Sequence, residues 1–196
     1  MLHTTLRLAH EAGACTNSYR AVAKALGGIQ AWGLDTPIPL VHILDIRGLD
    51  DTLWCLCCII PEDEAARDKL ARLLACDYAE HVAGFWVAPA GVSWQPRDTI
   101  EVARRYAYGD ATLLELEAVR KVANAARSAA WSSSAEDCAR RASWNSASTS
   151  AWSAQDSARN IARMVSVSAA KSAFLNNAWS AEREWQAQRL REVLEA

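Results

Sequence analysis

Residues 111–141 read ATLLELEAVRKVANAARSAAWSSSAEDCARR, and alanine and other good helix formers dominate this stretch. Neither glycine nor proline occurs between Asp110 and Ala196, so the second half of the chain lacks the residues that most strongly stop helices. One uninterrupted helix of that length would extend about 130 Å at 1.5 Å per residue. We therefore expect several long helices, with breaks near 143–150 and 175–180, where serine side chains can cap helix ends.

The surrounding tract, residues 111–181, contains 20 alanines and 14 serines. Small side chains let helices approach closely, and large tryptophans can fill the remaining gaps. Alanine favours helix over low-complexity disorder, and disordered segments contain few aromatic residues. The tract is also compatible with a homodimer through these helices. Its four tryptophans are Trp131, Trp144, Trp152 and Trp179.

The first half of the chain contains shorter helical segments that are separated by start and stop signals. Gly27-Gly28 supplies one left-handed stop. Pro61-Glu-Asp-Glu64 supplies a start, with proline and three acids in the first turn. The expected helices cover residues 19–26, 39–46, 52–60 and 61–83.

Residues 84–97 hold two glycines, two prolines and two tryptophans, and we expect them to form a long loop. Two candidate capping boxes follow, Asp98-Thr-Ile-Glu101 and Thr112-Leu-Leu-Glu115, and each predicts the start of a helix. The predicted fold is all-α, a multi-helix bundle with short N-terminal helices packed on long Ala/Ser/Trp-rich helices. We divide it into an N-terminal lobe, 1–95, and a C-terminal bundle, 96–196, within one compact unit.

The charge of the chain gives little reason to expect nucleic acid as a partner. The net charge is −2, and residues 96–196 carry 14 basic against 12 acidic side chains. An Arg-dependent nucleic-acid binder remains the third hypothesis, and it would need a continuous strip of arginines. The candidates are Arg104, Arg105, Arg120, Arg140 and Arg141.

The sequence predicts a cytoplasmic protein without a membrane segment. The first fourteen residues lack the apolar run of a signal peptide, and no stretch approaches the ~18 apolar residues of a membrane span. Three of the six cysteines, Cys55, Cys57 and Cys58, stand among large apolar residues. Their spacing suits a zinc site poorly, so we expect core packing, and we predict neither a metal nor a cofactor. His3 and His10 share a face, but we expect a frayed N-terminus there.

Asp77 and His81 form the most notable polar pair. Asp77 falls in the apolar stripe of the helix predicted to begin at Pro61, and His81 follows one turn later on the same face. One hypothesis is a carboxylate–imidazole dyad for base catalysis, or part of a metal site with Cys76. The alternative, which we favour, is a buried polar pair that ties the helix to the N-terminal lobe, for example by a hydrogen bond to the backbone of a loop.

Three tryptophans, Trp32, Trp86 and Trp94, lie in predicted loops. Exposed tryptophans there would act as interface anchors, and buried ones would cover the core. Asp50 and Asp51 precede a predicted helix, where their charge complements the helix dipole. They are also candidates for a polar cleft with Asp77 and His81.

Seven segments together resemble a loose group of helical proteins of bacteria and phages that are labelled immunity proteins. The resemblance covers most of the chain, and its motifs are structural. It implies a small helical protein of a phage or mobile element that acts by binding another protein, and it supplies no catalytic residues. The segments are Ala14-Cys15, 36–41, 48–54, 75–80, 97–104, 108–112 and 185–194.

The leading functional hypothesis is therefore a non-catalytic binding protein, either an immunity-type inhibitor or a phage factor that blocks a host defence complex. An enzyme or a protein that binds a small ligand or nucleotide at Asp77 and His81 is the second hypothesis. Neither fold class nor composition decides between them, because one fold supports many functions.

Overall fold

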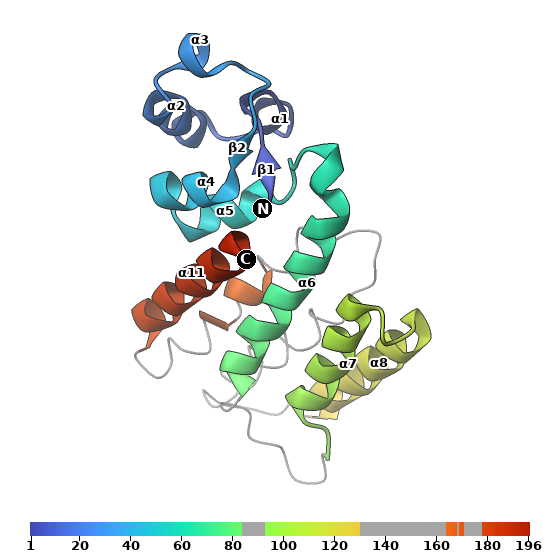
Figure 1. The fold of residues 1–196 in the computed structure, drawn as a ribbon. Coiled ribbons are helices and arrows are strands. Elements are labelled where there is room, and N and C mark those ends of the chain that lie inside the picture. Colours follow the sequence, from blue (N-terminus) through green and yellow to red (C-terminus); the bar gives the residue numbers. More distant parts are fainter. Residues whose placement is uncertain (84–92, 130–163, 168, 171–177) are drawn as a thin grey trace. The chain divides into compact units, whose positions relative to one another are not determined.

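The computed structural model describes residues 1–83, 93–129, 164–167, 169–170 and 178–196 (Figure 1). Helices dominate these residues, and the only strands among them are two of two residues each. The predicted all-α fold class is confirmed. The expected breaks near 143–150 lie outside the described residues, and so does most of the expected loop 84–97.

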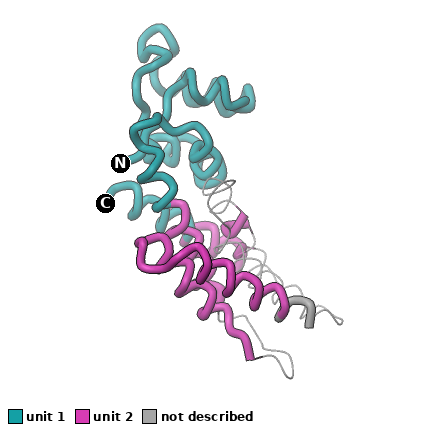
Figure 2. Tube along the Cα trace, turned by 90° about the vertical axis from the view of Figure 1, so that its right-hand side faces the viewer, with its two compact units in different colours: residues 1–70, 186–196 teal, residues 71–185 magenta. Residues whose placement is uncertain are grey.

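The chain forms two compact units (Figure 2). Unit 1 comprises Met1–Leu70 and Gln186–Ala196, and unit 2 comprises Ala71–Trp185. These bounds differ from the division at residue 95 that we expected from the loop 84–97. The lobe 1–95 and the bundle 96–196 within one compact unit stay a prediction.

The N-terminal part of unit 1 consists of short helices around one small sheet (Figure 1). Glycine or proline separates several of them, as the sequence predicted. The elements are β1 (His3–Thr4), α1 (Leu6–Glu11), α2 (Thr16–Ala25), α3 (Ile29–Trp32), β2 (Ile38–Pro39), α4 (Leu40–Arg47) and α5 (Leu49–Cys55).

The expectation of a frayed N-terminus is wrong. Strand β1 pairs antiparallel with β2, with His3 opposite Pro39 and Thr4 opposite Ile38. The backbone N–H of His3 also donates to Oδ2 of Asp63 at 2.8 Å. Partners distant in sequence therefore satisfy the backbone of the first residues, which local propensity cannot indicate.

The helix expected over 52–60 is displaced toward the N-terminus. Gly48, with φ at 78°, ends α4, and α5 begins directly after it at Leu49. At the other end, Ile59 forms a β-bridge with Thr4, and the N–H of Ile60 donates to the His3 carbonyl at 3.0 Å. This pairing requires extended backbone, so it takes residues 59–60 out of the helix.

The core of unit 1 is aliphatic. Helix, strand and loop residues all contribute to it, and Leu40 and Leu56 are completely buried. Burying one such side chain stabilises the fold by about 1.5–3 kcal/mol. Its largest fully buried members in the first seventy residues are Leu6, Ile38, Leu40, Leu53 and Leu56.

Longer helices follow the 3₁₀ turn η1 (Pro61–Asp63). The predicted helix over 61–83 corresponds to η1 and α6. Residues 164–167 and 169–170 are also helical. The long helices are α6 (Glu64–His81), α7 (Pro96–Tyr108), α8 (Leu113–Ala129) and α11 (Trp179–Glu195).

The two expected capping boxes have different outcomes. At α8, the box is confirmed, since the N–H of Glu115 donates to Thr112 Oγ1 at 3.2 Å and the Thr112 N–H donates to Glu115 Oε2 at 2.7 Å. At α7, Asp98 is the third helical residue, and its carboxylate accepts from the N–H of Gln95 at 3.2 Å. The helix therefore begins earlier than predicted, because Pro96 suits the first helical position.

Candidate functional site

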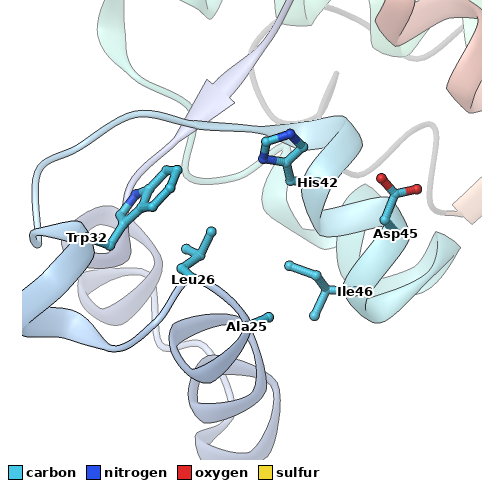
Figure 3. A pocket seen from close by; sticks show the side chains of 6 residues that line it. All are labelled: Ala25, Leu26, Trp32, His42, Asp45 and Ile46. Carbon is cyan, nitrogen blue, oxygen red and sulfur yellow. The ribbon is translucent and has the colours of Figure 1, made fainter.

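A groove on unit 1 is the candidate functional site (Figure 3). It has a volume of about 360 Å³ and is open to solvent. The end of α2, the end of α3 and the middle of α4 enclose it. Its lining residues, hereafter the Trp32 groove, are Ala25, Leu26, Trp32, His42, Asp45 and Ile46.

Glycines place Trp32 at the rim of this groove. Gly27 and Gly28 have φ of 86° and 97°, so α2 ends in a sharp left-handed turn before α3 begins. Trp32 is the last residue of α3. Thr36 holds the turn after it, since its Oγ1 donates to the Trp32 carbonyl at 2.6 Å and its carbonyl accepts from the Trp32 Nε1 at 3.4 Å. The indole is half-buried and fixed locally.

The polar side chains of the groove come from α4. His42 and Asp45 are three residues apart and therefore lie on one face of that helix (Figure 3). The Asp45 carboxylate accepts from Nη2 of Arg191 at 2.5 Å, yet half of the Asp45 side chain remains exposed. The hydrogen bond to Asp45 raises the pKa of Arg191.

The chemistry of the groove suits recognition. Ala25, Leu26 and Ile46 offer apolar surface, while Trp32 adds an aromatic ring. An imidazole and a carboxylate at the rim can orient an incoming polar group. None of the six lining residues is a serine, cysteine, threonine or lysine.

The structure does not join Asp77 and His81 in a dyad. Asp77 accepts from Nη1 of Arg104 at 2.7 Å, and Glu80 accepts from Nη2 of the same guanidinium at 2.6 Å. Arg104 therefore bridges two carboxylates of α6 from α7. Burial lowers the pKa of Arg104, but the hydrogen bond and charge of Asp77 outweigh that effect, and the net pKa is raised.

His81 has a different set of neighbours within unit 2. Its Nδ1 lies 2.6 Å from Oε2 of Glu182, whose side chain is only 3% exposed. The imidazole also stacks on the indole of Trp185. Glu182 and Trp185 belong to α11, so His81 connects two helices of this unit. Asp77 thus contacts α7 and His81 contacts α11, whereas the expected pair was buried and tied to the N-terminal lobe, and the His81 side chain is 41% exposed.

The remaining predicted site residues that the structure describes are Asp50, Asp51 and Trp94. Asp51 accepts from Nε of Arg47 at 2.7 Å, one turn earlier in the chain, and Asp50 is exposed in the first turn of α5. Trp94 is buried, with 6% exposure, and its Nε1 donates to Thr99 Oγ1 at 3.0 Å. It therefore covers the core instead of acting as an exposed anchor. Trp86 lies outside the described residues.

Two arginines of the proposed strip, Arg104 and Arg105, form ion pairs with acidic side chains. Arg104 is bound to Asp77 and Glu80, as described above. Arg105 donates to the Asp110 carbonyl at 2.9 Å and approaches Glu115 at 3.3 Å. Arg140 and Arg141 lie outside the described residues. The described part of the chain therefore offers little support for a continuous basic surface.

Of the three clustered cysteines expected in the core, Cys55 and Cys58 are buried and Cys57 is half-buried. Cys55, Cys58 and Cys76 are buried and free, whereas Cys15 is exposed. A hydrogen bond to Cys55, together with burial, raises the pKa of the Cys58 thiol to about 12. Burial raises the pKa of Cys76 to about 12 as well. These two thiols are protonated at neutral pH, which makes them poor nucleophiles and poor metal ligands.

Two further observations concern sites of other kinds. Among the described residues, no three His, Cys, Asp or Glu side chains lie close enough together to hold a metal ion. None of the helices in the described ranges combines the length and the apolar character that a membrane crossing requires.

The sequence alone did not point to His42, Asp45 or Glu182. The spacing His42-x-x-Asp45 on a predicted helix was an available signal, because residues three apart share a helix face. Glu182 offered no such signal, since it meets His81 across 101 positions of sequence.

Comparison of the chain with known proteins finds no matching family, no matching curated protein and no matching solved structure.

Proposed function

We propose that this chain is a non-catalytic binding protein that recognises a protein partner at the Trp32 groove. The observation that carries the proposal is the composition of the groove: an aromatic ring, three apolar side chains and two polar groups around one opening. Interfaces commonly concentrate their binding energy where an aromatic residue and a pocket exclude water.

A protein side chain fits this groove better than a freely diffusing small molecule. The groove is open, whereas small-ligand sites bury most of the ligand surface. Asp45 keeps half of its side chain exposed at the rim despite its contact with Arg191. A partner that presents an apolar side chain beside a cationic one would match both the apolar surface and the carboxylate.

The finer functional proposal rests on the resemblance to helical immunity proteins of bacteria and phages. We propose an inhibitor of the immunity type, or a phage factor that blocks a host defence complex, acting in the cytoplasm. The neutralising function of such a protein requires only occlusion of a partner surface, and no catalytic group.

The contacts of Asp77 and His81 argue against the enzymatic alternative, which depended on these two residues. Each side chain takes part in a separate contact between helices of unit 2, as shown by the bonds to Arg104 and Glu182. A catalytic dyad would require the carboxylate and the imidazole to face each other and a substrate.

The experiment is an affinity purification of the tagged chain from nuclease-treated lysate of a bacterial host, with mass spectrometry and then binding of the purified partner. The test variants are Trp32→Ala and Asp45→Asn. Trp179→Ala is the matched control, because Trp179 is 39% exposed and lies in unit 2.

We expect the unmodified chain to capture one protein in stoichiometric amount, and Trp32→Ala to lose it. The dissociation constant of Trp32→Ala for this partner should be at least about tenfold higher, as is typical when an interface anchor is removed. Trp179→Ala should leave the constant unchanged. Equal binding of the partner by all variants would show that the binding site lies outside the groove. Absence of any protein partner, with a metal or nucleotide retained by the purified chain, would favour the enzymatic alternative.

A further inference from the structure

Helix α8 carries a row of exposed apolar side chains. Leu114 is 76% exposed and Val122 is 54% exposed, and the alanines at 118 and 125 are exposed on the same side. Residues spaced by three and four positions share one helix face. The opposite side of α8 is buried at Leu116 and Ala123, in the unit where α7 packs on α8.

The positions of these side chains have a local symmetry. Leu114 and Val122 each stand four residues from Ala118, one on either side. A two-fold axis through Ala118 would therefore place Leu114 of one helix against Val122 of an antiparallel copy. Ala118 would meet its own counterpart, and its small side chain permits close approach of the two backbones. Such a self-complementary contact is the usual form of a symmetric dimer.

The charges beside the row select the antiparallel orientation. Glu117 and Lys121 flank the apolar side chains. In an antiparallel pair centred on Ala118, Glu117 of each helix lies beside Lys121 of the other, and this contact occurs twice. In a parallel pair in the same register, like charges would face each other, which is unfavourable.

We infer that α8 is an interface between two copies of this chain, packed antiparallel about Ala118. We choose a second copy of the chain as the partner because the apolar row is symmetric about Ala118. The charges that flank the row on one copy also complement those on an antiparallel second copy. The residues of this face are separate from those of the Trp32 groove, so the dimer and the binding function can fail independently.

The first test compares the mass of the full-length chain with that of two variants by light scattering after gel filtration, over a dilution series. Leu114→Asp places a charge in the row and should yield monomers. Leu113→Asp is the matched control, because Leu113 is 44% exposed but points away from the row. An acid at either position suits the first turn of a helix, so both variants should retain their fold by circular dichroism.

A second test uses cysteine cross-linking under mild oxidation. Ala118→Cys should form an intermolecular disulfide, because the two copies of that position lie on the axis. Leu114→Cys should not, since its two copies are separated by eight residues, or about 12 Å along the helix, and a disulfide needs less than about 7 Å between Cα atoms. The parental chain under the same conditions accounts for the native thiols.

A monomeric parental chain at every concentration would overturn the inference. So would a dimer that survives Leu114→Asp, which would place the interface elsewhere. Cross-linking of Leu114→Cys as efficiently as Ala118→Cys would indicate parallel helices and would also contradict it.

Discussion

The imidazole of His81 lies parallel to the indole of Trp185, with ring centroids 3.7 Å apart and an angle of 8° between the planes. The same imidazole bonds to Glu182 through Nδ1. One side chain of α6 therefore contacts two residues of α11 by two different interactions. Tyr78, one turn earlier on α6, meets the same indole edge-on at 6.1 Å. These contacts account for His81, one of the two residues that first suggested a catalytic dyad.

Replacement of His81 by alanine should lower the free energy of unfolding by about 1–3 kcal/mol, because the nearly buried Glu182 carboxylate loses this hydrogen bond. Chemical denaturation with urea measures the change. His42→Ala is the control, since His42 is exposed at the groove and should change stability by less than about 0.5 kcal/mol. Equal stability of His81→Ala and the parental chain would mean that the contact with Glu182 contributes no net stability.

Neighbouring arginines provide a second comparison. Arg104→Gln should destabilise the fold by about 1–3 kcal/mol, because Asp77, with only 10% of its side chain exposed, loses its guanidinium partner. Arg105→Gln should cost less than about 1 kcal/mol, because both Arg105 and Glu115 are close to half exposed. Urea denaturation of both variants gives the difference. An equal loss of unfolding free energy in both variants would show that the burial of Asp77 does not increase the cost of removing its partner.

The thiols should differ widely in reactivity. Cys15 is exposed, and a side-chain hydrogen bond with Ser18 lowers the pKa of its thiol. Cys58 and Cys76 are buried with pKa values near 12. Alkylation with iodoacetamide at neutral pH, followed by peptide mapping, should modify Cys15 well before the other two. In urea the three rates should converge, and convergence in the native protein would contradict the burial of Cys58 and Cys76.

The start of α8 should respond to acid. Hydrogen bonds from Thr112 lower the pKa of Glu115 below its ordinary value of 4.5. A lowered pKa means that the stabilising contribution is present above pH 4.5 and is lost as the pH falls through the lower folded value. The protection factors of the amides in the first turn of α8, which correct the exchange rates for their intrinsic pH dependence, should therefore fall as the pH passes through that range. Glu115→Gln should remove this fall, and protection factors that stay constant in the parental chain would contradict the role of the carboxylate.

Local signals predicted much of the fold, because helix ends depend on neighbouring residues. Thr112 with Glu115 marked the start of α8, and the Gly27-Gly28 pair marked the end of α2. The sequence did not predict the pairing of Thr4 with Ile38 and Ile59, since two-residue strands have no recognisable period. That distant pairing also displaced the end of α5.

The candidate site was predictable only in part. Trp32 was identified by its place in a predicted loop, and it lines the groove. His42 and Asp45 were overlooked because two exposed polar residues on a helix are ordinary. Asp77 and His81 were identified correctly as unusual, but their partners come from other helices. Arg104 stands 27 positions from Asp77, and such separations carry no periodic signal.

Unit 1 combines the first seventy residues with the stretch from Gln186 onward, and this arrangement constrains the order of events during synthesis. The strand pair and the helices around the Trp32 groove leave the ribosome early. Arg191, which bonds to Asp45 at the groove rim, is added 121 residues after Leu70. At roughly 5–20 residues per second, that delay is about 6–24 s. During this interval the nascent chain lacks the arginine partner of Asp45 and the buried side chains of Leu190 and Leu194, so unit 1 cannot complete its core until translation reaches α11.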